Sequence, residues 1–308
     1  MKSITVDGEM TGAAVPPLSR KKTRKKMTRK QKIFYQKLLR AGVQVFFFVM
    51  FPSVFNAAFS GVKEIFTRLG AGQVIEFSAF VKVLIAVCIF TMIFGRFFCG
   101  YACAFGAFGD ALHGIYVGIC RKRKKKPRGL NPKTARILTY GKYILLAGIV
   151  LMCFTGTYER AQGTSPWDVF SRVRVFNFGL AEYASGIVIL ICLMIYMFFE
   201  ERFFCRFICP MGAVFALLPV LPWFHLHRDR PNCAKGCRAC TNTCPADVEL
   251  PSYGESRVCG ECIQCGKCVG VCPRQHIKTG TTKIRGNEPW YVLLRAASLA
   301  AIFIWLGV

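Results

Sequence analysis

The sequence predicts a polytopic α-helical membrane protein with four to five transmembrane helices, a duplicated hairpin unit and a cysteine-rich C-terminal α+β domain. Three observations lead to this fold class. The 308 residues are 53% hydrophobic, with a mean hydropathy of +0.37, which is unusual for soluble domains. One cysteine-bearing element occurs twice, each time after an apolar stretch. A dense run of cysteines then precedes the last apolar stretch.

The apolar stretches define the predicted membrane spans. A bilayer core about 30 Å thick requires roughly 20 mostly apolar residues per helix. Four stretches meet this requirement, and a fifth carries Arg295 near its start, where a long basic side chain can reach the interface. We therefore predict transmembrane helices at 41–62, 78–95, 137–157 and 183–199, with a candidate fifth at 290–308.

The net charge of +26 is concentrated in two basic runs beside these spans. Residues 20–40 hold eleven Lys or Arg and residues 121–136 hold nine, with no acidic residue in either run. This is the positive-inside pattern, and attraction to anionic membrane lipid explains the runs without a nucleic acid. We expect a multi-pass protein of the bacterial cytoplasmic (inner) membrane, with its N-terminus and residues 200–289 in the cytoplasm.

The repeated element reads RFFCGYACAFG from Arg96 and RFFCRFICPMG from Arg202. Each copy follows a predicted hairpin, so an even number of spans places both copies on one side of the membrane. The pattern predicts two parallel units related by a pseudo-two-fold axis. The predicted order is a basic cytoplasmic tail (1–40), a first hairpin with its Cys-x3-Cys element (41–120), a basic loop (121–136), a second hairpin with its element (137–227), a cysteine-rich domain (228–280) and the candidate fifth helix (290–308).

The two Cys-x3-Cys pairs are candidate redox or metal thiols: Cys99, Cys103, Cys205 and Cys209. Arg96 and Arg202 lie three residues before a cysteine and would favour a thiolate. The alternative is that these cysteines are small apolar packing residues. That interpretation is the one we adopt for Cys88, Cys120, Cys153 and Cys192.

The C-terminal cysteines predict two iron–sulfur clusters in a bacterial-ferredoxin-like α+β domain. Residues 262–273 contain the complete run Cys-x2-Cys-x2-Cys-x3-Cys-Pro, and residues 233–245 differ from it by one extra residue in the first gap. In two-cluster ferredoxins the last cysteine of each run binds the other cluster. We assign the first [4Fe–4S] cluster to Cys233, Cys237, Cys240 and Cys272, and the second to Cys244, Cys262, Cys265 and Cys268.

A disulfide or zinc framework is the alternative for these cysteines. Disulfides are rare on the cytoplasmic side, and a zinc site does not require two runs that end in Cys-Pro. Cys259 belongs to neither set and has no predicted role.

The order of these features resembles the NapH/NosR/MauN-type membrane-bound 4Fe-4S ferredoxin family, with CcoG-like proteins more distant. The resemblance covers about residues 40–280 and rests on both cysteine pairs, Pro210 and the eight ferredoxin cysteines. The family has a proline after both pairs, whereas this chain has Ala104 after the first. By resemblance, the protein passes electrons between a cytoplasmic or quinol donor and an extracytoplasmic redox partner, which could be a flavin-binding protein.

The expected function is therefore that of an electron-transfer subunit of an oxidoreductase system rather than a stand-alone enzyme. The alternatives are a copper-reducing assembly factor of a respiratory enzyme and a cluster-based redox sensor. Two clusters on one side cannot span a core about 30 Å thick, so a quinone, a flavin or the Cys-x3-Cys pairs must bridge it. Haem is not expected, because no histidine lies inside a predicted span: His113, His225, His227 and His276. A flavin is not expected either, because the segment Asp7–Ala14, which loosely resembles a flavin attachment site, reads as a disordered tail.

Overall fold

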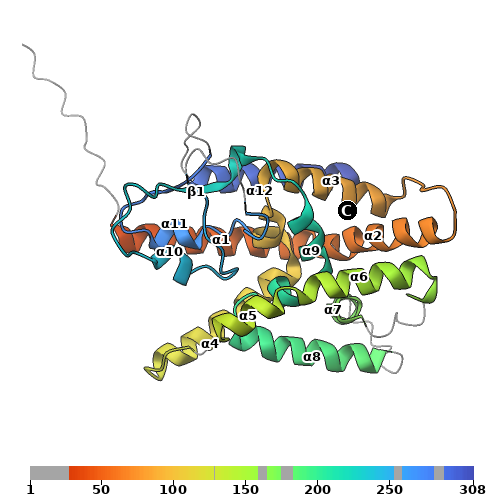
Figure 1. The fold of residues 1–308 in the computed structure, drawn as a ribbon, viewed down its shortest axis with the longest axis horizontal. Coiled ribbons are helices and arrows are strands. Elements are labelled where there is room, and N and C mark those ends of the chain that lie inside the picture. The colour runs from red at the N-terminus through yellow and green to blue at the C-terminus, as the bar shows by residue number, and fades with distance from the viewer. Residues whose placement is uncertain (1–27, 128, 159–164, 175–182, 253–258, 281–287) are drawn as a thin grey trace, which may run out of the picture.

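The computed structural model describes residues 28–127, 129–158, 165–174, 183–252, 259–280 and 288–308. The segment Asp7–Ala14 lies outside the described residues. Figure 1 shows an elongated helical assembly with the cysteine-rich domain at one end, beside the N-terminal half of helix α1 (Arg29–Met50). The other main helices are α2 (Val54–Gly70), α3 (Ala79–Phe94), α4 (Ala104–Lys122), α5 (Pro132–Leu138), α6 (Gly141–Phe154), α7 (Pro166–Arg174), α8 (Ala184–Phe199), α9 (Pro210–Leu217) and α12 (Glu288–Leu306).

Three helices in the described part of the chain are long and apolar enough to cross a membrane: Lys30–Met50, Lys133–Phe154 and Glu288–Leu306. Helices α3 and α8 match the predicted spans at 78–95 and 183–199 but have 16 residues each. At 1.5 Å per residue they are about 24 Å long. The structure thus supports a membrane protein, while the number of spans remains a prediction.

The predicted span at 41–62 is wrong, because two helices meet within it. Helix α1 ends at Met50 and helix α2 starts at Val54. Pro52 lies between them and has no N–H to continue the hydrogen-bond ladder. Helix α1 instead starts upstream, at a capping box formed by Thr28 and Gln31. Residues 29–40 of the predicted basic tail therefore belong to a helix, and α2 packs against α3.

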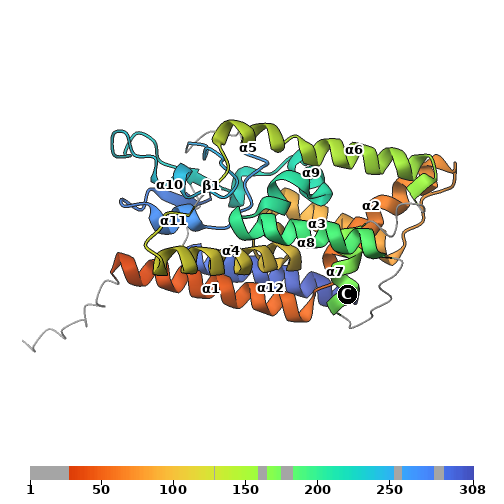
Figure 2. The ribbon, with the colours of Figure 1, turned by 90° about the horizontal axis from the view of Figure 1, so that it is seen from below.

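Arg295 also departs from the prediction that it reaches the interface. Its side chain is fully buried and donates from Nη2 to the Phe224 carbonyl oxygen at 2.8 Å and from Nη1 to Gln264 Oε1 at 3.4 Å. The guanidinium is therefore solvated by protein groups beside the cysteine-rich domain. Helix α12 lies next to α1, as Figure 2 shows, and closes the assembly on that side.

The two repeated elements have matching backbones. Each contains a widened π-helical turn, η1 (Phe98–Ala102) and η4 (Phe204–Ile208). In both, the second cysteine is the N-cap of the following helix, and its N–H bonds five residues back: Cys103 to the Phe98 carbonyl at 2.9 Å, Cys209 to the Phe204 carbonyl at 2.8 Å. Single π turns are rare and occur frequently at functional sites.

The cysteine-rich domain has an α+β fold. Strand β1 (Leu226–Arg228) pairs antiparallel with β2 (Ile277–Thr279), and the short helices α10 (Ala239–Asn242) and α11 (Lys267–Val271) connect them. Its small core contains Leu226, Leu250, Cys262, Cys268 and Ile277. Strand β1 starts at Leu226, two residues before the predicted domain boundary at residue 228.

Candidate functional site

The eight ferredoxin cysteines surround two small cavities. One cavity is lined by Cys233, Cys237, Cys240 and Cys272 among its residues. The other is lined by Cys244, Cys262, Cys265 and Cys268. These are the two sets that the spacing assigned, with the fourth cysteine of each run at the other cavity. Cys240 lines both cavities, so the two sites are adjacent.

The backbone around the second cavity turns because of two residues with positive φ. Gln264 has a φ of 54° and Gly266 a φ of 70°, a conformation that glycine adopts without steric cost. Both lie between Cys262 and Cys268, so successive cysteines face the same cavity. A hydrogen bond from the first repeated element holds this loop, because the Tyr101 hydroxyl donates to the Cys265 carbonyl oxygen at 3.4 Å.

The donor set fits iron–sulfur clusters. All 17 cysteines are free, which argues against a disulfide framework. Among the described residues, no three His, Cys, Asp or Glu side chains could share a single metal ion. In a [4Fe–4S] cluster each cysteine binds a different iron, so its four sulfurs surround a cavity rather than one point. Burial raises the pKa of the Cys262 and Cys268 thiols, so a bound cluster would supply the positive charge that stabilises their thiolates.

Arg228 is a site residue that sequence reasoning missed. Its Nη2 donates to Cys233 Sγ at 3.1 Å and to the Cys237 carbonyl oxygen at 3.1 Å. The His276 N–H also donates to Cys272 Sγ at 3.4 Å. Hydrogen bonds to ligating sulfurs are one of the factors that set cluster potentials. The one available signal is the position of Arg228 five residues before Cys233.

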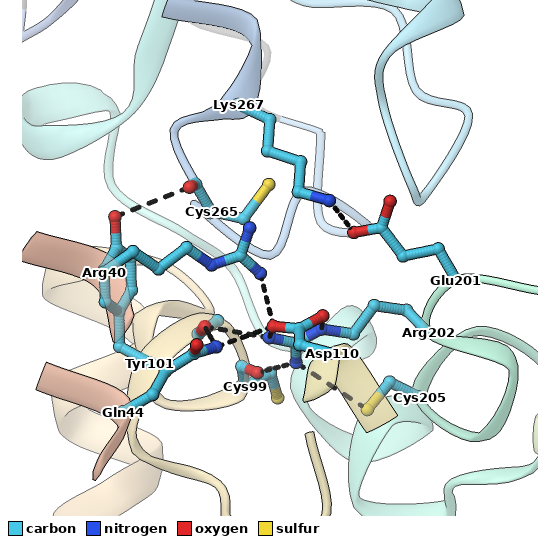
Figure 3. Close-up of polar contacts among 11 residues, drawn as sticks. Arg40, Gln44, Cys99, Tyr101, Asp110, Glu201, Arg202, Cys205, Cys265 and Lys267 are labelled. Atoms are coloured by element: carbon cyan, nitrogen blue, oxygen red, sulfur yellow. Dashed lines mark hydrogen bonds and ion pairs between the residues drawn. The ribbon is translucent and has the colours of Figure 1, made fainter. Parts of the chain in front are cut away.

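The four cysteines of the repeated elements are buried and lie together. Their exposed fractions range from 4% to 7%. Arg202 donates from Nη1 to the Cys99 carbonyl oxygen, and the same atom lies 4.0 Å from Cys205 Sγ. Figure 3 shows Cys99 and Cys205 next to this guanidinium. Burial raises the pKa of Cys209, and the neighbouring Cys205, Cys99 and Cys103 raise it further, which places all four thiols within electrostatic reach.

The expectation that the arginines favour thiolates is met only in part. Burial raises the pKa of the Cys205 thiol, and the neighbouring Arg202 offsets this increase without reversing it. Burial also raises the pKa of Cys103. At Cys103 and Cys205, burial therefore has a larger effect on the thiol pKa than the neighbouring Arg202.

Asp110 joins the two repeats beneath these thiols. It accepts from Arg202 Nε at 2.8 Å and from Arg202 Nη2 at 2.6 Å. Arg40 Nη2 and Gln44 Nε2 each donate to its Oδ2 at 2.6 Å (Figure 3). Burial alone would raise the pKa of Asp110, but Arg202 and Arg40 hold it well below its usual value. His113 lies one turn further along α4, and its Nδ1–H donates to the Phe198 carbonyl oxygen at 3.1 Å.

Glu261 attaches the cysteine-rich domain to both repeats. Its Oε2 accepts from Arg96 Nη1 at 3.0 Å and from Lys142 Nζ, and its Oε1 accepts from the Tyr143 hydroxyl at 2.7 Å. Arg96 and Lys142 are almost completely buried. The loop also passes against the π turn, because a Cβ at Gly100 would overlap with the Ile263 carbonyl oxygen. The sequence offered no signal for these contacts, since Glu261 lies between Cys259, which has no predicted role, and Cys262, which was assigned to a cluster by spacing.

Comparison with known families gives a match to a 4Fe-4S binding domain at residues 79–127 and 184–231. Each matched region contains one hairpin helix and one Cys-x3-Cys element. The two matches agree with an internal repeat, although they do not establish how many helices each unit contains.

Several known proteins are similar to this chain over most of its length. Uncharacterized protein MJ0750 of Methanocaldococcus jannaschii is 28% identical over 77% of this chain and 92% of its own length. Ferredoxin-type protein NapH of Haemophilus influenzae is 25% identical over 64% of this chain and 66% of its own. Protein NirI of Paracoccus denitrificans is 28% identical over 66% of this chain but 30% of its own length. No solved structure matches the chain significantly.

Proposed function

These matches support a NapH/NosR/MauN-type ferredoxin family for this chain, and on that premise we propose that it relays electrons between a cytoplasmic or quinol donor and an extracytoplasmic redox partner. The ferredoxin-type relatives and the 4Fe-4S domain support an iron–sulfur electron-transfer role. The observation that carries the proposal is the pair of adjacent cavities, each lined by one of the two predicted ligand sets.

The proposed ligand sets are Cys233, Cys237, Cys240 and Cys272 for one [4Fe–4S] cluster, and Cys244, Cys262, Cys265 and Cys268 for the other. Such clusters take up and release single electrons. The chain itself holds the ligands in place: Arg228 donates to a sulfur of the first set, and Tyr101 bonds the backbone of the second.

The proposed orientation places the cysteine-rich domain in the cytoplasm, at the inner bacterial membrane. The basic N-terminal half of α1 packs against this domain through α11, and Lys32 Nζ donates to Gln275 Oε1 at 3.3 Å. Because basic residues flank spans on the cytoplasmic side, both would lie inside. Helix α7 would then lie towards the extracytoplasmic partner.

A groove beside both clusters supports quinol as the donor. Two neighbouring cavities share five lining residues from α1, α11 and α12: Gln36, Leu39, Gly270, Glu288 and Pro289. One of them reaches Cys272 of the first set and the other reaches Cys265 of the second. Tyr35 and Trp290 line the groove and are more than half exposed, as is typical of aromatic residues at a membrane interface.

Glu288 supplies the polar group that quinol oxidation requires. Its side chain is buried, its Oε2 accepts from the Thr279 hydroxyl, and its Oε1 has no partner among the described residues. A quinol hydroxyl in the groove could donate to this free oxygen. Quinol oxidation releases two electrons and two protons, so a carboxylate next to two one-electron acceptors suits the reaction.

The test is anaerobic reduction of the purified protein by a quinol, followed by cluster absorbance, in the parent and in Glu288→Gln. We expect the quinol-dependent rate to fall on the order of 100-fold in the variant, with unchanged reduction by dithionite. Glu249→Gln, an exposed carboxylate of the same domain, is the control and should behave as the parent. Equal quinol rates in all three proteins would exclude this groove as the donor site. Reduction by a low-potential ferredoxin but not by quinol would indicate a cytoplasmic donor.

The alternatives remain predictions. Neither a copper-reducing assembly factor nor a redox sensor is favoured by a specific observation among the described residues.

A further inference from the structure

Each repeated element places its arginine against the other element. Arg202 of the second repeat lies against Gly106 of the first, so that a Cβ at Gly106 would overlap with its Nη1. Arg96 of the first repeat lies against Gly212 of the second, where a Cβ would be 3.1 Å from its Nη2. Gly106 and Gly212 occupy the same position in the repeat, three residues after Cys103 and Cys209. The two elements therefore form one paired site rather than two separate ones.

Towards this paired site, Arg96 directs N–H groups that lack a hydrogen-bond partner in the described part of the chain. Its Nη1 bonds Glu261, but its Nε and Nη2 are buried and have no hydrogen-bond partner among the described residues. Although burial alone would lower the pKa of Arg96, it is raised overall by Cys99, Glu261 and Cys209. A buried guanidinium with free N–H groups beside four thiols indicates that the site binds something anionic.

Two helices also begin at the site. Cys103 is the N-cap of the 19-residue helix α4, and Cys209 is the N-cap of the 8-residue helix α9. The Gly212 N–H donates to Cys209 Sγ at 3.2 Å. Helix N-termini stabilise negative charge through their free N–H groups and dipole. Buried phenylalanines surround the elements and exclude water: Phe98, Phe105, Phe204, Phe207 and Phe215.

The four thiols do not converge on one point, as the ligands of a single ion would. No three Cys, His, Asp or Glu side chains in the described ranges could share one metal ion, which argues against copper or zinc bound by these cysteines alone. An iron–sulfur cluster separates its ligands, because each thiolate binds its own iron or shares one with a single other thiolate. It also carries net negative charge, which buried arginines and helix N-termini stabilise.

We propose that Cys99, Cys103, Cys205 and Cys209 hold a third iron–sulfur cluster, shared between the two repeats. This inference rests on the proposed electron-relay function and adds the centre that carries the electron into the membrane. Gln44 of α1 donates to the Gly100 carbonyl at 3.2 Å, and Phe303 of α12 contacts the Phe98 ring at a centroid distance of 6.4 Å. Phe303 lies 15 residues after Glu288, so its contact with the first repeated element lies about 22 Å further along α12 than the groove at Glu288.

The proposed step is a transfer of one electron. Cys244, Cys262, Cys265 and Cys268 would hold the donor of this electron, and Cys99, Cys103, Cys205 and Cys209 would hold its acceptor. No bond forms or breaks, and no proton moves. Tyr101 and Arg202 lie between these centres: Tyr101 bonds Cys265, and Arg202 bonds Cys99 (Figure 3). The extracytoplasmic partner of the proposed relay then oxidises the third cluster.

The test is the iron and acid-labile sulfide content of the full chain, purified anaerobically, with Mössbauer spectra. Two ferredoxin clusters account for about eight irons, so the parent should contain two or four more. The variant Cys103→Ser/Cys209→Ser should lose this excess and keep about eight. Cys153→Ser, at a buried cysteine of α6, is the matched control and should keep the excess.

A parent with eight irons, an excess that persists in the double variant, or zinc or copper in place of the excess iron would overturn the inference. The parent count decides the question even if the double variant does not fold. As a second check, Cys262→Ser should lower the ferredoxin iron and leave the excess in place. Eight irons in the parent would refute the third cluster alone, whereas a parent without any cluster would refute the proposed function.

Discussion

Replacing Glu261 by Gln should detach the cysteine-rich domain from the membrane helices. The carboxylate compensates Arg96 and Lys142, whose side chains are 1% and 0% exposed, while its own is 29% exposed. Removing one partner of a buried ion pair costs about 3–5 kcal/mol, because the other charge remains buried and unpaired. Since Glu261 is partly solvated, we expect the lower end, about 3 kcal/mol. This corresponds to roughly 100-fold more frequent opening of the contact.

The assay is hydrogen exchange of the loop 259–265 in the parent and in Glu261→Gln. Amide protection in this loop should fall by about two orders of magnitude in the variant, without loss of iron. Glu249→Gln is the control, because its ion pair with Arg230 is about half exposed and contributes at most about 1 kcal/mol. Equal protection in the three proteins would show that the Glu261 contacts do not attach the domain.

Three further predictions follow from the same geometry. Cys268→Ser should damage one cluster and leave part of the other, so the iron bound by the eight ferredoxin cysteines should fall from about eight towards about four per chain. Gly100→Ala should lower the thermal stability of the protein, because the added Cβ would overlap with the Ile263 carbonyl oxygen. The control Gly114→Ala has open space around it and should be neutral or stabilising by about 0.5–1 kcal/mol. Labelling of introduced cysteines in intact cells should find position 165 outside and residues 259–280 inside, and an external cluster domain would contradict the proposed orientation.

Local patterns in the sequence were sufficient to predict a 4Fe-4S protein and to propose the ligand sets and the repeat. The cysteine spacing specifies which side chains can surround one cavity, because the ligands lie within a few residues of one another. The structure places each set at its own cavity. The repeat was visible because its arginine, phenylalanines and cysteines recur at one offset.

Contacts between distant residues could not be predicted in this way. Asp110 and Glu261 neutralise the two repeat arginines, at sequence separations of 92 and 165 residues. The repeat itself suggests the wrong partner, because the residue equivalent to Asp110 in the second copy is Ala216. The first span was mispredicted for another reason: hydropathy is high on both sides of Pro52, so the helix break leaves no gap in the apolar pattern.

The most direct test of the electron-relay account is transfer across a sealed membrane. The protein would be reconstituted in liposomes, the clusters reduced from the side of the cysteine-rich domain, and a membrane-impermeant dye monitored on the other side. The account predicts that the dye is reduced in proportion to the incorporated protein, and that transfer is lost in Cys268→Ser. If the clusters become fully reduced but the dye on the far side remains oxidised, the protein does not carry electrons across the membrane, and the central claim is wrong.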